Sequence, residues 1–144
     1  MKHFLMVLII FLLIPLPVLA EDKIFCVIVN TSVPINSITT TKLRNIYLGN
    51  KVTWDNNFPI NVVKYKYPIE VHEEFVRRYM RMSPMQFYIH WRRLLHTGSH
   101  TNVLLVDNVF DMLETIETTW GSIGYIYDTY CNPNFTNINR LYVQ

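Results

Sequence analysis

The chain has 144 residues, of which 50% are hydrophobic and 17% are charged, and its formal net charge at pH 7 is only +2. Charges this close to balance give no electrostatic case for a nucleic-acid partner. The sequence has no internal repeat and no low-complexity tract, which argues against a repeat architecture or a disordered chain. Its length corresponds to a single small domain.

The first twenty residues have the organisation of a secretory signal peptide. A short basic start precedes an apolar run, and Val18-Leu19-Ala20 fits the small-x-small pattern of a signal peptidase site. A retained membrane anchor is the alternative, but the run is near the lower length limit for spanning a bilayer and contains two prolines. The pattern predicts a signal peptide over residues 1–20, cleaved near Ala20, and an exported domain over residues 21–144 without a stable membrane span.

Strand and helix patterns alternate after this segment. Residues 24–29 form an apolar run rich in β-branched side chains, which predicts a buried strand. Helical spacing follows over residues 43–49, and Trp54 lies in a turn from which it is expected to fold back onto the core. Residues 59–64 predict a second strand, which leads into a helix that starts near Glu70.

The second half of the chain continues the alternation. Ser83-Pro84-Met85-Gln86 has the residues of a capping box and predicts a helix start, and Gly98 ends that helix. Asp107 or Asn108 can cap a further helix. Three more strands are predicted, at residues 103–106, 123–127 and 141–143, the last of them at an edge of the sheet. This order predicts an α/β fold in which helices pack on a mostly parallel sheet.

The two cysteines, Cys26 and Cys131, lie near opposite ends of the predicted exported domain. An exported protein can keep a disulfide, but a bridge requires the two segments to be close in space. The alternative is one buried and one exposed thiol, and spacing alone does not decide between them. Without a CxxC spacing, the pair does not predict a zinc site or thioredoxin-type chemistry.

Three stretches carry motifs that point to a family. In "ITTTKLRNIYLGNKVTWDNNFPINVV" a helix ends in an aromatic-Leu-Gly step before a tryptophan turn and a strand, and in "ETIETTWGSIGYIYD" a helix leads into a Gly-x-Ile-Gly-Tyr strand. Both resemble phosphate-type periplasmic solute-binding proteins of ABC transporters, and "SPMQFYIHWRRLLHTGSH" resembles short members of that group. The matching residues are Leu43, Ile46, Tyr47, Leu48, Gly49 and Trp54 in the first pattern, and Gly121, Ile123, Gly124 and Tyr125 in the second.

The resemblance covers most of residues 24–128 and implies one lobe of a type II periplasmic-binding-protein-like fold in the periplasm. It implies a small anion such as phosphate as the ligand, with no cofactor. A full receptor of this kind closes two lobes on its ligand, whereas the predicted exported domain has about the size of one. A lone lobe offers half a cleft, so burying an anion would need a second chain.

The strand-to-helix junction is the place where the resemblance puts the anion. The family usually carries small polar residues there, but this chain reads Tyr67-Pro68-Ile69-Glu70. Proline has no N–H to donate. Glu70, Glu73 and Glu74 place carboxylates in the first helical turn, where they interact with the helix dipole themselves. We therefore expect a weakened anion site.

Two groups of residues are the candidate ligand contacts, one at the junction and one in the loop after the predicted tryptophan-bearing helix. They are Lys64, Tyr65, Lys66, Thr97, Gly98 and Ser99. A solvated strand end and a helix C-cap are the respective structural alternatives. No nucleophile or carboxylate pair has a catalytic context, so the chain is not predicted to be an enzyme. No metal site is expected, because Gly98 interrupts the helical spacing between His96 and His100.

Two functions remain open. The first is a single-lobe module that binds a small anion at the junction together with the Thr97–Ser99 loop. The alternative is an interaction protein that has kept the fold, lost the ligand and contacts an envelope sensor, a transporter or another copy of itself. A basic cluster indicates either a solvated surface or an anionic partner, such as an acidic protein or lipid headgroups. Its members are Arg77, Arg78, Arg81, His90, Arg92, Arg93, His96 and His100.

Overall fold

The computed structural model describes residues 22–132 and 134–144, and the predicted signal peptide lies outside them. Within these residues six strands form one sheet in the order β2-β6-β1-β5-β3-β4. The strands are β1 (Phe25–Asn30), β2 (Ser37–Ile38), β3 (Asn61–Tyr65), β4 (Asn102–Val106), β5 (Ser122–Tyr127) and β6 (Ile138–Val143). β1 is antiparallel to both of its neighbours, and the other pairs are parallel. The prediction of a mostly parallel sheet in an α/β fold is confirmed.

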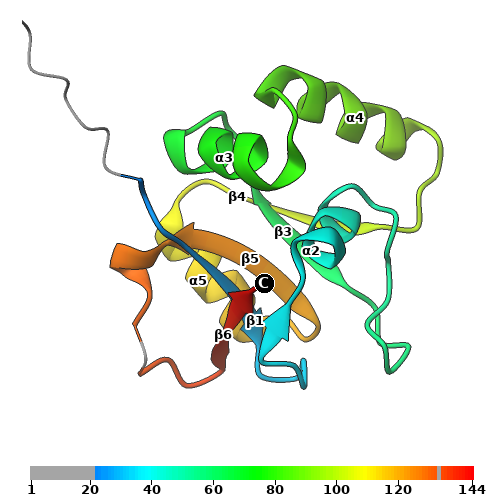
Figure 1. Cartoon of the computed structure of the whole chain (residues 1–144). Coiled ribbons are helices and arrows are strands. Elements are labelled where there is room, and N and C mark those ends of the chain that lie inside the picture. The colour runs from blue at the N-terminus through cyan, green and yellow to red at the C-terminus, as the bar shows by residue number, and fades with distance from the viewer. Residues whose placement is uncertain (1–21, 133) are drawn as a thin grey trace, which may run out of the picture.

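Helices cover both faces of this sheet (Figure 1). They are α2 (Thr40–Tyr47), α3 (Glu70–Phe75) with its π-helical continuation η2 (Val76–Met80), α4 (Pro84–His96), α5 (Val109–Thr118) and the 3-10 turn η3 (Asp128–Tyr130). On one face, Tyr47 of α2 and Phe75 of α3 pack against Tyr125 of β5. On the other face, Met112 and Ile116 of α5 lie directly over Gly124. Adjacent strand residues point to opposite faces, so the domain has three layers.

The predicted helix starts are confirmed where capping chemistry defines them. Ser83 forms the complete capping box with Gln86 at the start of α4, where Pro84 occupies the first helical position. Of the two candidates for the start of α5, Asn108 is the cap, and its side-chain oxygen accepts from the N–H groups of Phe110 and Asp111. Each cap supplies partners for N–H groups that a helix start leaves unpaired.

The tryptophan turn folds back onto the core as predicted. Trp54 is only 3% exposed, and its indole N–H donates to the carbonyl of Gly121 at 3.0 Å. Gly121 has a φ of +69°, and a Cβ at this position would lie 2.4 Å from the carbonyl oxygen of Pro59. The turn and the start of β5 therefore meet at a position that only glycine fits.

The prediction for the last strand was wrong in its place within the sheet. β6 spans Ile138–Val143 rather than residues 141–143, and it lies between β1 and β2. The strand at this edge of the sheet is β2. The sequence did not predict β2, because two residues are too few for a periodic pattern. None of the helices in the described residues is long and apolar enough to cross a membrane.

Candidate functional site

The carboxyl ends of β3, β4 and β5 meet at one edge of the sheet. Tyr65 pairs with Val106 at the ends of β3 and β4, and β5 runs parallel to β3. In open α/β sheets, ligands bind in the crevice beyond the carboxyl ends of such strands. A pocket of about 370 Å³ occupies this edge. Its lining residues are Tyr65, Ile69, Glu70, Val71, Asp107, Asn108, Val109, Tyr127 and Tyr130.

Aromatic and aliphatic side chains form most of the pocket wall, and its charged side chains are acidic. Glu70 enters from the start of α3, and Asp107 enters from the end of β4. Asn108 also lines the pocket, but its amide oxygen caps α5 and its amide nitrogen donates to Asp111 at 3.0 Å. The pocket thus suits an apolar or cationic group better than an anion.

The residues just before α3 supply no free backbone N–H group. The N–H of Ile69 donates to the carbonyl of Tyr67 at 2.9 Å, and Pro68 has no N–H. Ile69, the N-cap residue, provides no side-chain hydrogen bond. No side chain caps the first-turn N–H groups of Glu70, Val71 and His72, but the carboxylates of Glu70 and Glu73 lie in the same turn and would repel an anion there.

The carboxylates of α3 are held by neighbouring side chains. Lys23 forms ion pairs with Glu70 and, at 3.9 Å, with Glu74, and the Tyr127 hydroxyl donates to Glu74 at 2.9 Å. The hydrogen bond from Lys23 lowers the pKa of Glu70, and the same bond raises the pKa of Lys23. The positive end of the helix dipole is thus compensated by the chain's own charges.

The three candidate residues at the junction do not act as one group. Lys64 points away from the pocket, with its ammonium 5.7 Å from the ring centre of Trp91 in α4, and burial lowers its pKa. Tyr65 lines the pocket and is 2% exposed, and burial raises its pKa. Lys66 is exposed, with its ammonium 5.1 Å from the ring centre of Tyr67. Strand alternation separates Lys64 from Tyr65.

The loop Thr97–Ser99 lies at the opposite end of the parallel strands. It precedes Asn102, the first residue of β4, which pairs with Asn61 at the start of β3. About 13 Å of strand therefore separates this end from the pocket, at roughly 3.3 Å per residue. Thr97 is the C-cap of α4, and its N–H donates to the carbonyl of Arg93. The structure does not bring this loop together with Lys64–Lys66.

Four pocket or junction residues were missed by the sequence analysis. Asp107, Tyr127 and Tyr130 follow or end strands whose neighbours in the sheet were unknown, and Lys23 comes from the segment before β1. The signal that could have found the first three is the rule that ligands bind at the carboxyl ends of parallel strands. No local pattern predicts the pairing of Lys23 with Glu70, because these residues are 47 positions apart.

A buried histidine lies behind the pocket on the α3 side. The Nδ1 atom of His72 is 2.5 Å from the hydroxyl of Tyr125, and the ring is 8% exposed. Burial, and secondarily the positive charge of Lys64, lower the pKa of His72 to about 4. The imidazole is therefore neutral at pH 7, and its Nδ1 shares a hydrogen bond with the tyrosine hydroxyl.

We expect this histidine to make stability depend on pH. The pKa of His72 in the folded state lies below the unfolded value of 6.5. The stabilisation that the neutral ring contributes to the folded state is therefore complete above pH 6.5 and is lost as pH falls towards about 4. The total loss is about 3 kcal/mol for a shift of this size. Urea denaturation across this range should show the decline in wild type. His72→Gln, which keeps an acceptor for Tyr125, should remove it, whereas the exposed His100→Gln should retain it. An unchanged profile in His72→Gln would contradict the assignment.

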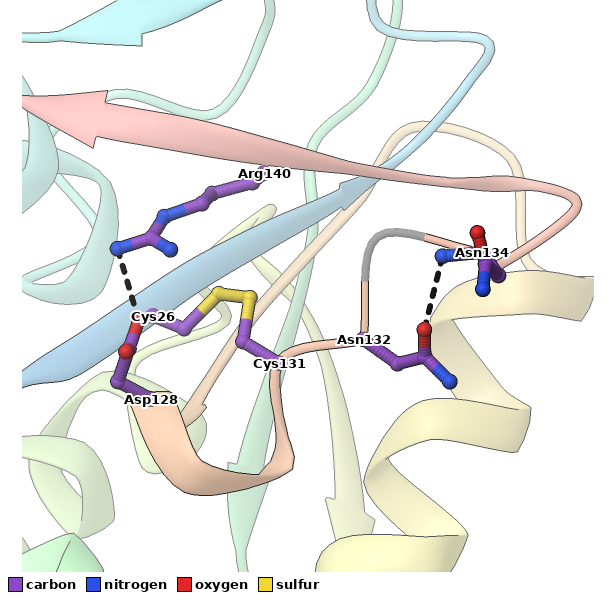
Figure 2. The surroundings of a disulfide bond; sticks show 6 residues. All are labelled: Cys26, Asp128, Cys131, Asn132, Asn134 and Arg140. Carbon is purple, nitrogen blue, oxygen red and sulfur yellow. Dashed lines mark hydrogen bonds and ion pairs between the residues drawn. A yellow bond between two sulfur atoms is a disulfide. The ribbon is translucent and has the colours of Figure 1, made fainter.

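A disulfide connects β1 with the segment after η3 (Figure 2). Cys26 and Cys131 are bonded, with their Cα atoms 6.1 Å apart. The sequence left a disulfide and two free thiols as alternatives, and the structure contains the disulfide. Asp128 lies beside the sulfur atoms and pairs with Arg140 at 2.8 Å. Because both sulfurs are in the disulfide, this group offers no thiolate to a metal ion.

The domain combines a three-layer arrangement with one strand, β1, that is antiparallel in an otherwise parallel sheet, and comparisons with known proteins test the predicted likeness to one lobe of a periplasmic-binding-protein-like fold. No family model matches the sequence, and no curated protein matches it either. Several solved structures are similar to it in fold, and three of them have identities of 16–17%. The first, from Clostridium perfringens, is described as a phosphate ABC transporter substrate-binding protein with bound phosphate (16% identity, TM-score 0.65, 84% of this chain and 45% of that chain).

Two further similar structures give nearly the same values. One is an ABC-type phosphate transport receptor from Vibrio cholerae, with 16% identity and a TM-score of 0.64 over 84% of this chain and 46% of that one. The other is PstS from Borrelia burgdorferi, with 17% identity and a TM-score of 0.64 over 84% of this chain and 47% of that one. The chain thus spans less than half the length of the structures it matches. The resemblance predicted from the sequence is confirmed for the fold. The first of these proteins is named as a substrate-binding protein and the second as a transport receptor.

Proposed function

We propose that the protein is an exported, solute-binding-protein-like domain that acts as an interaction protein in the periplasm and no longer holds a small anion. Residues 1–20 are its signal peptide in this proposal. One observation carries it: the pocket at the ligand edge is walled by tyrosines and aliphatic side chains, and its charged groups are carboxylates. A partner protein would insert an apolar side chain there, and the exposed Tyr67 and Tyr130 would extend the contact.

The electrostatics of the pocket argue against phosphate. A phosphate in this pocket would be repelled by the carboxylates that line it. Glu70 and Asp107 both line the pocket, and Lys23 is engaged with Glu70 and Glu74. Pro68 and Ile69 supply no free N–H groups to offset this repulsion.

Anion binding is the second candidate. Lys66 is exposed at the same edge, and a structure with this fold holds phosphate. Since the chain spans 45% of that protein, a second lobe or a second chain would have to supply the remaining donors. This candidate therefore predicts that binding depends on Lys66 and on a partner surface.

Calorimetry with phosphate and sulfate at constant ionic strength separates the two functions. We expect no heat of binding and no shift in melting temperature, because the carboxylates at the junction repel anions. Micromolar stabilisation by either anion that is lost in Lys66→Ala would overturn the interaction proposal. Lys51→Ala, which removes an equal charge from the tryptophan turn, serves as the control for a general effect of charge.

A photo-crosslinking side chain at position 67 tests the interaction directly. We expect one defined adduct with an envelope protein from position 67 and none from position 142, since Tyr142 is equally solvent-accessible but lies on β6. Tyr130→Ala should weaken the adduct because it removes part of the pocket wall. Equal adducts from both positions would show that the pocket edge is not the contact surface.

A further inference from the structure

The segment between residues 76 and 106 carries only positive charge. It contains five arginines, three histidines and no aspartate or glutamate, although the whole chain has 11 acidic residues. The basic residues are Arg77, Arg78, Arg81, Arg92, Arg93, His90, His96 and His100. A protein with nearly balanced charge thus has one strongly basic region, and α4 is its centre.

α4 buries a narrow stripe and exposes a wide one. Phe87 and Trp91 are its buried side chains. Four large apolar side chains of the same helix are instead exposed. They are Met85 (64%), Tyr88 (56%), Ile89 (47%) and Leu95 (63%). Figure 1 shows α4 as the outermost helix of its layer, with one long side away from the sheet.

These exposed apolar residues share one face with basic residues. At i, i+3, i+4 and i+7 spacing, residues 85, 88, 89, 92 and 96 lie on the same side of a helix. We call Met85, Tyr88, Ile89, Arg92, Leu95 and His96 the α4 outer face. The Arg92 guanidinium lies 5.7 Å from the ring centre of Tyr88, and Arg92 forms no ion pair with any described residue. The fold therefore leaves both the apolar groups and this cation unpartnered.

We propose that the α4 outer face binds the surface of an anionic lipid bilayer. A helix that interleaves exposed apolar and basic residues can lie in the plane of the headgroups, with its apolar side chains at the acyl boundary. Arginine side chains can lie along the apolar surface and place their guanidinium groups at lipid phosphates. The outermost position of α4 leaves this face accessible to a flat partner. This binding is independent of the pocket at the sheet edge, which lies at the start of α3 and α5.

Vesicle co-sedimentation tests the proposal, using purified protein with the same N-terminus in every variant. Binding is expected to vesicles of phosphatidylcholine with phosphatidylglycerol and not to phosphatidylcholine alone, and it should weaken as salt rises. Arg92→Glu/Arg93→Glu should reduce partitioning by at least about tenfold. Met85→Gln/Ile89→Gln, which keeps the charge and the helix propensity, should reduce it several-fold.

Two controls make the result decisive. Lys42→Glu/Lys51→Glu changes the net charge by the same amount at the tryptophan turn, and it should partition nearly as wild type. If it loses as much binding as the arginine variant, net charge rather than the α4 outer face is responsible, and the proposal fails. Equal binding to neutral vesicles would also overturn it. So would tight binding to soluble polyglutamate that is insensitive to Met85→Gln/Ile89→Gln, because the partner would then be an acidic protein surface.

Discussion

Replacing both Cys26 and Cys131 by alanine is expected to lower the free energy of unfolding by about 4 kcal/mol. The disulfide joins residues separated by 105 positions, and a cross-link that closes so long a loop removes much of the conformational entropy of the unfolded chain. Domains of this size have only about 5–15 kcal/mol of stability, so the variant should be close to its unfolding threshold at growth temperature. Urea denaturation of the oxidised wild type and the double variant measures the difference.

Reduction provides the control for this prediction. Cys26 is fully buried, so its replacement also loses packing, whereas reducing the wild type removes the cross-link alone. We expect dithiothreitol to destabilise the wild type by most of the same amount and to leave the double variant unchanged. A loss below about 1 kcal/mol in reduced wild type would show that the bridge contributes little to stability.

Phe75→Ala is expected to lower the free energy of unfolding by about 3–5 kcal/mol, the usual cost of removing a buried phenylalanine ring. The Phe75 side chain is fully buried, and its ring stacks on Tyr125 with centroids 3.7 Å apart and planes 4° from parallel. It also packs edge-on against Tyr47 and Phe25. Truncation would open a cavity where α2, α3 and the sheet meet.

Phe110→Ala is the matched control, because Phe110 is 73% exposed. Exposed substitutions usually change stability by no more than about 0.5 kcal/mol. Chemical denaturation of both variants should show an unchanged slope with denaturant and a lower midpoint for Phe75→Ala only. Similar midpoints for the two variants would mean that the aromatic stack does not hold α3 against the sheet.

Local chemistry explains which elements the sequence predicted correctly. Ser83, Pro84 and Gln86 specify a helix start within four residues, so α4 begins where expected. Trp54 was placed correctly because a large aromatic in a polar turn is stabilised by folding onto the core. The places of β2 and β6 in the sheet depend on hydrogen bonds between distant residues, and no pattern within one segment encodes them.

The candidate site was predictable in location but not in chemistry. The junction after β3 was predicted from the order of strand and helix, and a pocket lies there. The direction of Lys64, however, follows from the packing of α4 against the same face of the sheet. The engagement of Glu70 follows from Lys23, which comes from another segment. Which side chains pair across the layers depends on the tertiary structure, and this pairing decides whether an anion would find free donors.

The position of β1 has a consequence for how fast the protein folds. β1 is an interior strand of the sheet, and both of its partner strands come from the far end of the chain. Phe25 pairs with Tyr127, and Val27 pairs with Leu141. Closing loops of this length costs chain entropy before the new contacts compensate for it, and topologies of this kind fold in milliseconds to seconds rather than microseconds. During that interval the apolar residues 25–29 of β1 have no partner, and such a strand is a template for aggregation. This exposure of β1 therefore lasts until residues 138–143 have paired with it.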